Sequence, residues 1–221
     1  RASLPGMTAE NIDSPARPGV FERSMILVTV TSVTMLYAMT VTIANVSLPQ
    51  MQGALSATTD QIALVVTFNI IATAIATPMS GWLAARFSRR TILIWGVTGF
   101  TAASLACGLA TSLEALVFFR VLQGAFGAPL VPLSQATVMD SYPQEQRGSA
   151  MAVFGMGVVI GPVLAPTIGG ILSELYGWRW VFFMIVPCGL IALAGVMIYI
   201  QDRRKAGSTY LDWTGFLTLS V

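Results

Sequence analysis

The residues best suited to chemistry in this sequence lie inside a long apolar run, where charged groups are rare. Arg120 interrupts the otherwise uncharged residues 115–139, and Gln123, Gly124 and Gly127 follow it at helical spacing. In a helix these four positions share one face. An ionisable side chain in a bilayer costs about 3 kcal/mol on insertion scales and marks a candidate functional site. We therefore interpret Arg120 and Gln123 as substrate or coupling residues.

Snorkelling is the alternative interpretation of Arg120. In this arrangement the apolar stem stays buried while the guanidinium reaches water at the membrane surface. Glu114, which marks the end of the run, precedes Arg120 by six residues, or about 9 Å of helix. That distance leaves both interpretations open.

A second polar group lies near the end of the first apolar run, which reads Thr40-Val-Thr-Ile-Ala-Asn-Val-Ser-Leu-Pro49. Serine and threonine often bond only to carbonyls of their own helix. An unpaired amide in hydrocarbon costs several kcal/mol, so Asn45 should find a partner on another helix or in a water-filled cavity. Thr40 and Asn45 therefore join the candidate substrate or coupling residues.

Three arginines within five positions close the segment Gly81-Trp-Leu-Ala-Ala-Arg-Phe-Ser-Arg-Arg90. Guanidinium groups keep their charge and offer forked donors, so they could hold carboxylates or carbonyls at neighbouring helix ends and stabilise one conformation of a moving bundle. Pro78 and Gly81 favour a kinked, closely packed helix end. The alternative is ordinary anchoring at the cytoplasmic surface. The predicted cytoplasmic latch comprises Gly81, Arg86, Arg89, Arg90, Asp140 and Arg147.

Small residues recur every fourth position along the fifth apolar run, at 157, 161, 165 and 169. Such a stripe lets two helices pack backbone to backbone. Two prolines beside it each remove an intrahelical donor. We favour a surface where two moving halves meet, with a purely structural packing helix as the alternative. The candidate residues are Gly157, Gly161, Pro162, Pro166, Gly169 and Gly170.

These segments require transmembrane helices, because a hydrocarbon core about 30 Å thick needs about 20 apolar residues. Runs of that length cover residues 25–48, 62–85, 91–113, 115–139, 148–173 and 181–201, and all of them are uncharged except for Arg120 in the fourth. The predicted fold is an all-α membrane protein whose residues 25–201 form a six-helix bundle. We expect residues 1–24 to be a disordered cytoplasmic tail, 202–212 a cytoplasmic linker, and 213–221 the start of a truncated seventh span.

The composition excludes most other classes of protein. Of the 221 residues, 55% are hydrophobic and only 10% are charged, against about 25% charged in soluble domains. There is no histidine, and Cys107 and Cys188 both lie in apolar runs, where we expect buried thiols. We therefore expect no enzyme activity, no metal site and no cofactor. A nucleic-acid partner would need a basic surface that this sequence lacks.

The positions of the basic residues predict the orientation, because cytoplasmic loops are enriched in Lys and Arg. With the N-terminus in the cytoplasm, ten of the twelve basic residues fall on that side, Arg179 falls outside and Arg120 lies within the membrane. The loops at Gly81–Arg90 and Gly170–Arg179 also match each other at an offset of 89 residues. Three spans separate them, which indicates an inverted repeat of three plus three helices, as in secondary transporters.

The motifs together resemble the major facilitator superfamily, specifically its branch of fourteen-span drug:proton antiporters of the EmrB/QacA type. The resemblance runs from about residue 35 to 221 and corresponds to the N-terminal half of such a protein. It is carried by the segments 40–49, 81–90 and 120–127 and, most specifically, by Gly157-x3-Gly161-Pro162-x3-Pro166-x2-Gly169-Gly170. It implies export of small hydrophobic or amphipathic compounds by alternating access, driven by the proton gradient across the bacterial cytoplasmic membrane. The implied partners are the lipid bilayer, a small-molecule substrate, and a C-terminal half or partner subunit.

Four positions depart from the family pattern. Thr40 stands where such families commonly carry a membrane Asp, and Ala85 and Ser88 replace an Asp and a Gly of the loop signature. Ile185 replaces an Asn that is usual at the entry of the sixth span. All ten acidic residues fall in loops or at span ends. Proton antiport commonly uses an intramembrane carboxylate, so coupling would rest on the other half, on Arg120, or be absent. The alternatives are an uncoupled facilitator or importer, and a truncated half that does not transport without a partner.

Overall fold

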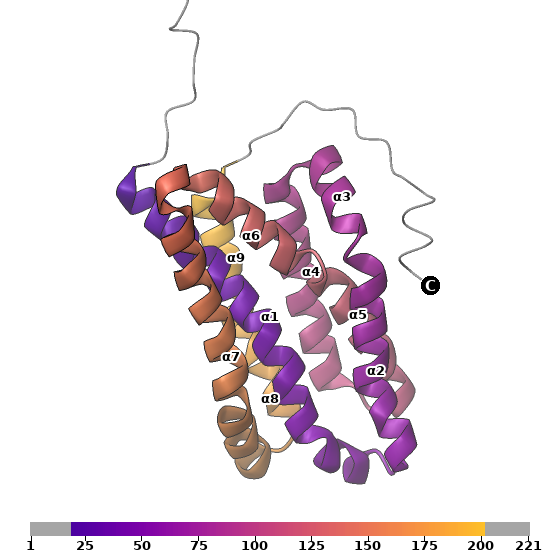
Figure 1. Ribbon diagram of the computed structural model, residues 1–221. Coiled ribbons are helices and arrows are strands. Elements are labelled where there is room, and N and C mark those ends of the chain that lie inside the picture. The colour runs from indigo at the N-terminus through magenta and orange to yellow at the C-terminus, as the bar shows by residue number, and fades with distance from the viewer. Residues whose placement is uncertain (1–18, 202–221) are drawn as a thin grey trace, which may run out of the picture.

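The computed structural model describes residues 19–201, which are helical apart from short turns (Figure 1). Six stretches in this range are long and apolar enough to cross a membrane. The predicted all-α membrane bundle is confirmed, whereas the predicted tail, linker and seventh span lie largely or wholly outside the described residues. The elements are α1 (Val20–Ala54), α2 (Thr59–Ala76), α3 (Met79–Phe87), α4 (Arg89–Leu109), α5 (Leu113–Gly127), α6 (Leu130–Ser141), η1 (Gln144–Gln146), α7 (Arg147–Tyr176), α8 (Arg179–Phe183) and α9 (Ile185–Tyr199).

Three of the predicted spans are interrupted rather than continuous. The second divides into α2 and α3 before Met79, the fourth into α5 and α6 before Leu130, and the sixth into α8 and α9 at Met184. A proline accompanies each interruption, at positions 78, 129 and 187. Proline has no backbone N–H and leaves the carbonyl four residues earlier without its helical partner. The kink expected near Pro78 is therefore present, and two further kinks accompany it.

Helix α1 runs along the front of the bundle between α7 and α2 (Figure 1). It packs most extensively against α7, while α2 packs against α5, and α4 packs against both α5 and α9. The start of α1, the α3–α4 turn, the α6–α7 turn and the end of α9 gather at one end of the bundle (Figure 1). Arg89 and Arg90 begin α4 and Arg147 begins α7 at this end, whereas Arg179 begins α8 at the opposite end.

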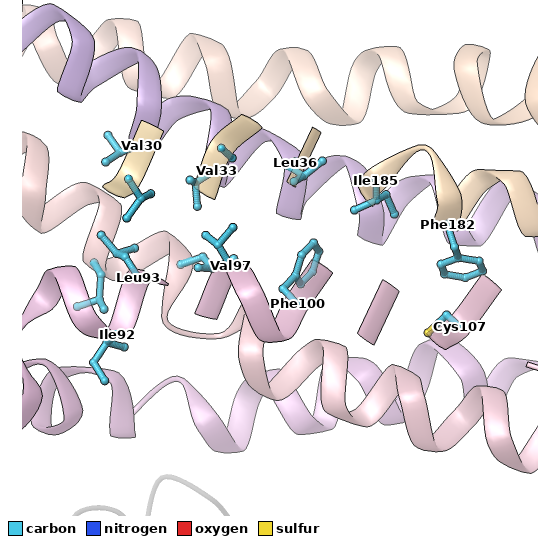
Figure 2. Close-up of a cluster of buried hydrophobic side chains, with 14 of the residues drawn as sticks. Val30, Val33, Leu36, Ile92, Leu93, Val97, Phe100, Cys107, Phe182 and Ile185 are labelled. Atoms are coloured by element: carbon cyan, nitrogen blue, oxygen red, sulfur yellow. The ribbon is translucent and has the colours of Figure 1, made fainter. Parts of the chain in front are cut away.

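Part of the apolar core lies between α1, α4 and the last two helices. Val30 and Val33 of α1 face Val97 of α4, and Cys107 lies beside Phe182 (Figure 2). Cys107 is buried, but Cys188 is exposed on the outside of α9, so the expectation of two buried thiols is wrong for Cys188. An apolar run does not distinguish the core from the outer surface of a membrane helix, since both are apolar.

The turns before α4 and α8 have the same backbone geometry. Ser88 has φ 81° and ψ 151°, and Gly177, 89 residues later, has φ 89° and ψ 161°. The amide of Ser88 donates to the carbonyl of Ala84 at 3.1 Å, and that of Gly177 donates to Ser173 at 3.0 Å. Ala84 and Ser173 are also 89 residues apart. The repeat in the sequence therefore corresponds to a repeat in the structure, and we call Ser88 and Gly177 the elbow residues.

Replacing Ser88 with glycine is expected to stabilise the bundle. Its backbone lies in a region that is essentially restricted to glycine and costs other residues about 1–3 kcal/mol. The Ser88 hydroxyl accepts a hydrogen bond from the Thr91 amide at 3.3 Å, but replacing a serine cap with glycine costs only a few tenths of a kcal/mol. Thermal denaturation of the purified protein should show a higher midpoint for Ser88→Gly.

The matched variant at the other elbow is expected to have the opposite effect. Gly177→Ser introduces a side chain at φ 89°, where a Cβ meets no neighbour but the backbone itself is strained. The midpoint should fall. If both substitutions shifted it in the same direction, backbone strain would not be the cause.

Candidate substrate and coupling site

Helix α5 presents a buried polar face to the helices that it packs against, α2 and α4. The Ser112 hydroxyl caps its first turn by accepting a backbone hydrogen bond at 3.2 Å. Arg120, Gln123, Gly124 and Gly127 are all buried. The predicted helix face thus points into the bundle and away from its outer surface.

Arg120 is held entirely by groups inside the bundle, and its side chain is 0% exposed. Its Nε donates to the carbonyl of Val65 on α2 at 3.3 Å, and its Nη1 donates to Oε1 of Gln123 at 2.5 Å. A snorkelling arginine would extend its guanidinium towards water. The snorkelling alternative is therefore wrong.

Gln123 extends this contact to a third helix. Its Nε2 donates to the Ser104 hydroxyl on α4 at 2.6 Å, and that hydroxyl donates to the carbonyl of Phe100 at 2.7 Å. The amide oxygen of Gln123 thus accepts from arginine while its nitrogen donates to serine, which fixes the orientation of the amide. A continuous hydrogen-bonded chain links α2, α5 and α4, and we call Arg120, Gln123 and Ser104 the buried triad.

The charge of Arg120 has no acidic partner in residues 19–201. Its Nη2 atom is buried without a hydrogen-bond partner, and the guanidinium carbon lies 6.0 Å from the ring centre of Phe182. A cation near an aromatic ring gains a modest electrostatic attraction. Arginine keeps its charge even when buried. The buried guanidinium therefore has one nitrogen without a hydrogen-bond partner and a positive charge without an acidic partner in the described range.

Two polar residues of α2 contribute to this region and were not among the predicted site residues. Nδ2 of Asn69 donates to the backbone carbonyl of Arg120 at 2.8 Å, and the Thr73 hydroxyl donates to that of Gly124 at 3.2 Å. A Cβ at Gly124 would lie 2.4 Å from the Asn69 carbonyl oxygen, so the two helices meet at backbone distance. An amide in the middle of an apolar run was the signal that could have identified Asn69.

The two candidates on α1 do not join the buried triad. Thr40 is buried, and its hydroxyl donates to the carbonyl of Leu36 in its own helix at 2.7 Å. Asn45 is exposed on the surface of the bundle. The expected partner for Asn45 on another helix is therefore not found among residues 19–201, because its amide points outward. A water-filled cavity or a second bundle remains the place where it could bond.

The predicted latch divides into separate contacts. Arg89 forms a salt bridge with Asp140 and also donates to the carbonyl of Ala136 at 3.3 Å, which joins α4 to α6. Arg90 donates to the carbonyl of Met197 on α9 at 2.7 Å. Arg89 thus binds a carboxylate and a carbonyl of α6, and Arg90 binds a carbonyl in the last turn of α9.

The other latch candidates do not reach these groups. The guanidinium of Arg86 lies over the ring of its neighbour Phe87 at 5.9 Å, and Arg147 donates to the carbonyl of Tyr142 at 3.2 Å within its own turn. A Cβ at Gly81 would meet nothing within 4 Å. The expectation that Gly81 lies at a closely packed helix end is therefore wrong, because α3 leaves this residue exposed.

Breaking the salt bridge between Arg89 and Asp140 is expected to have a small effect on stability. Both side chains are about one third exposed, at 32% and 37%. Such pairs contribute about 0.2–1 kcal/mol and weaken as salt is added. A double-mutant cycle with Arg89→Gln and Asp140→Asn, read by thermal denaturation, should give a coupling energy in this range. A much larger or salt-independent value would contradict this account of the pair.

The small-residue stripe at positions 157, 161, 165 and 169 packs against α1 within the same bundle. A Cβ at Gly157 would lie 2.0 Å from Cγ2 of Thr31, and one at Gly161 would lie 2.8 Å from the backbone oxygen of Met35. The predicted surface between two moving halves is thus wrong for the stripe itself. Pro166 is exposed, and a Cβ at Gly170 would meet nothing within 4 Å. These two residues point away from α1.

The chemistry available in the described range is polar binding in a buried setting. No group of three or more Cys, Asp or Glu side chains there is placed to hold a metal ion. A kinked helical bundle with a buried cation on a central helix has the architecture of a membrane transporter. A bacterial homologue of the human lysosomal transporter Spinster, solved in an inward-facing and unoccupied conformation, shares this fold with a TM-score of 0.73 and 24% identity, over 91% of this chain and 49% of that one.

Residues 30–216 match the Major Facilitator Superfamily, and the chain belongs to this family of transporters. It is 40% identical over 163 residues to the multidrug export protein EmrB of Escherichia coli, which covers 74% of this chain and 31% of that protein. It is 39% identical over 181 residues to the fatty acid resistance protein FarB of Neisseria gonorrhoeae, covering 81% and 36%. The chain therefore spans about a third of the length of these relatives. Family membership agrees with the expectation that it is not an enzyme.

Proposed function

We propose that this chain is the N-terminal bundle of a proton-coupled exporter of small hydrophobic or amphipathic compounds, acting by alternating access. We place it in the bacterial cytoplasmic membrane with its N-terminus in the cytoplasm, because the basic residues favour that orientation. The observation that carries the proposal is the buried triad, in which Arg120 has no acidic partner in the described range. The relatives, which include a multidrug export protein and a fatty acid resistance protein, support the substrate class.

The proposed role of Arg120 follows from its surroundings. Coulombic attraction is several times stronger near a protein interior than in water. A polar or anionic group that reaches Nη2 would satisfy a buried donor and balance a charge at the same time. If the group binds more tightly in one conformation of the transporter than in the other, binding shifts the equilibrium between them, as alternating access requires.

The proton carrier is proposed to lie outside this bundle or to act through Arg120. The six carboxylates in residues 19–201 lie in turns or at helix ends, and they are Glu22, Asp60, Glu114, Asp140, Glu145 and Glu174. An exchange between proton and substrate commonly needs a carboxylate in the membrane. A second bundle would supply it, and the substrate would bind between the two bundles.

Everted membrane vesicles that contain the full-length gene product test this proposal. Ethidium and a long-chain fatty acid serve as probes, with vesicles from an otherwise identical strain lacking the gene as the control. Export should appear as uptake into the vesicles when a pH gradient is imposed, and it should stop when an ionophore dissipates the gradient. Unchanged transport without the gradient would favour the uncoupled facilitator, for which Thr40 and Ala85 are the motivation. The absence of transport of either probe would contradict the proposed exporter.

A further inference from the structure

Two arginines each bind the carbonyl end of a helix that neighbours their own. Arg90, the second residue of α4, donates through Nη2 to the carbonyl of Met197 in the last turn of α9 at 2.7 Å. Arg179, the first residue of α8, donates through Nη2 to the carbonyl of Ala110, directly after α4, at 3.0 Å. Each contact places a positive charge where the exposed carbonyls of a helix end concentrate negative potential.

The two contacts are equivalent under the inverted repeat. Arg90 and Arg179 are 89 residues apart, and each lies two positions after its elbow residue, Ser88 or Gly177. The elbows share one backbone geometry. The start of α4 therefore caps the end of α9, and the start of α8 caps the end of α4.

The contacts lie at opposite ends of the pair, because α4 has 21 residues and is about 30 Å long. Side chains of each helix also pack directly against glycines of the other. A Cβ at Gly108 would lie 2.5 Å from the ring of Phe183, and one at Gly189 would lie 2.2 Å from the Thr101 hydroxyl. The helices are therefore packed along their length and bonded at both ends.

A gate in an alternating-access protein opens at one membrane face while it closes at the other. In this structure the arginine hydrogen bonds at both ends of the α4 and α8–α9 pair are formed in the same conformation. We infer that Arg90 and Arg179 are reciprocal helix caps that hold α4, α8 and α9 as one rigid frame. They are positioning residues, and the role of Arg179 also explains why a basic residue stands at the end of the bundle opposite the other arginines.

Cysteine labelling can read each end of the frame separately. The reporter for the Arg179 end is the native Cys107, which is 0% exposed and lies beside Phe182, in protein whose exposed Cys188 and any cysteine outside this chain are replaced with alanine (Figure 2). The reporter for the Arg90 end is Val196→Cys in protein from which every native cysteine has been removed. Val196 is 0% exposed and precedes Met197. Full-length protein in membranes is labelled with N-ethylmaleimide, a permeant reagent.

Each cap should protect only its own end. Arg179→Gln is expected to speed labelling of Cys107 about tenfold and leave the reporter at position 196 unchanged, because a hydrogen bond to a charged group is lost locally. Arg90→Gln should do the reverse. Lysine at either position keeps the charge and should restore most of the protection. Arg86→Gln, which removes an exposed arginine without touching a helix end, should change neither rate.

Two results would overturn the inference. Faster labelling of both reporters in both glutamine variants would mean general loss of structure, and unchanged rates in both would mean that the contacts do not hold the helix ends. A third labelling measurement distinguishes a rigid frame from a gate that opens during transport. In the two reporter proteins with both arginines intact, neither rate should respond to ethidium or to an imposed pH gradient, and a response at either end would show that the pair opens during transport.

Discussion

Replacing Arg120 with methionine is expected to abolish transport while leaving the free energy of unfolding within about 2 kcal/mol of the parent value. Arg120 is a buried cation without an acidic partner in residues 19–201, so an apolar side chain of similar length removes an unfavourable charge. The substitution also leaves Oε1 of Gln123 without its donor. A lost partner of this kind costs about 1–3 kcal/mol, which roughly offsets the gain.

Transport should respond differently, because methionine can neither donate a hydrogen bond nor attract an anionic group. Uptake of ethidium into everted vesicles should fall to the level of the strain without the gene. Arg120→Lys keeps the charge but not the forked geometry, so we expect partial activity. Thermal denaturation and membrane abundance are measured on the same preparations.

The double variant Arg120→Met with Gln123→Leu separates the two effects. It removes both ends of the 2.5 Å hydrogen bond, so the protein should be more stable than Arg120→Met alone and equally inactive. Normal transport by either variant at normal abundance would remove Arg120 from the transport site. A large loss of stability in both would mean that the arginine has a structural role.

The second large effect is expected at Gly161, where the added methyl group of alanine should force α1 and α7 apart. Its Cβ would lie 2.8 Å from the backbone oxygen of Met35. A backbone atom cannot rotate away as a side chain can, so the helices themselves must separate. Overpacking costs about 1–3 kcal/mol and occasionally more. We expect a lower denaturation midpoint, less folded protein in the membrane and a corresponding loss of transport.

Gly155→Ala is the matched control in the same helix. A Cβ at this position would meet nothing within 4 Å, so the substitution should be neutral or stabilise α7 by up to about 1 kcal/mol. The comparison holds the chemistry constant and varies only the contact with α1. Equal midpoints for the two alanine variants would contradict the tight packing of α1 against the stripe.

Much of the fold could be predicted from the sequence because a bilayer restricts the solutions so strongly. Long apolar runs predicted the six spans, and the offset of 89 residues predicted an inverted repeat, whose two elbow residues share one backbone geometry. The buried face of α5 followed from helical spacing alone. The interruption of the fourth and sixth spans was not predicted, although Pro129 and Pro187 were visible, since a proline in a membrane helix bends it in some settings and interrupts it in others.

The partners of individual side chains could not be predicted in the same way. Periodicity places Gln123 on the same face as Arg120 but does not identify Ser104 as its next partner, because contacts between helices depend on packing angle and register. Asn45 was expected to have a partner on another helix or in a water-filled cavity and is exposed, whereas Asn69 was overlooked and is buried. A polar residue in an apolar run indicates that a partner exists without indicating which helix supplies it.

The central claim is that residues 25–201 form one of two bundles in a longer transporter. The most direct test is the mass of the native gene product, obtained by adding an N-terminal tag to the gene at its own locus and blotting the membrane fraction. The account predicts a band far above the 23.5 kDa of this chain, in the range expected for two bundles. A band at 23.5 kDa, with nothing larger, would contradict it.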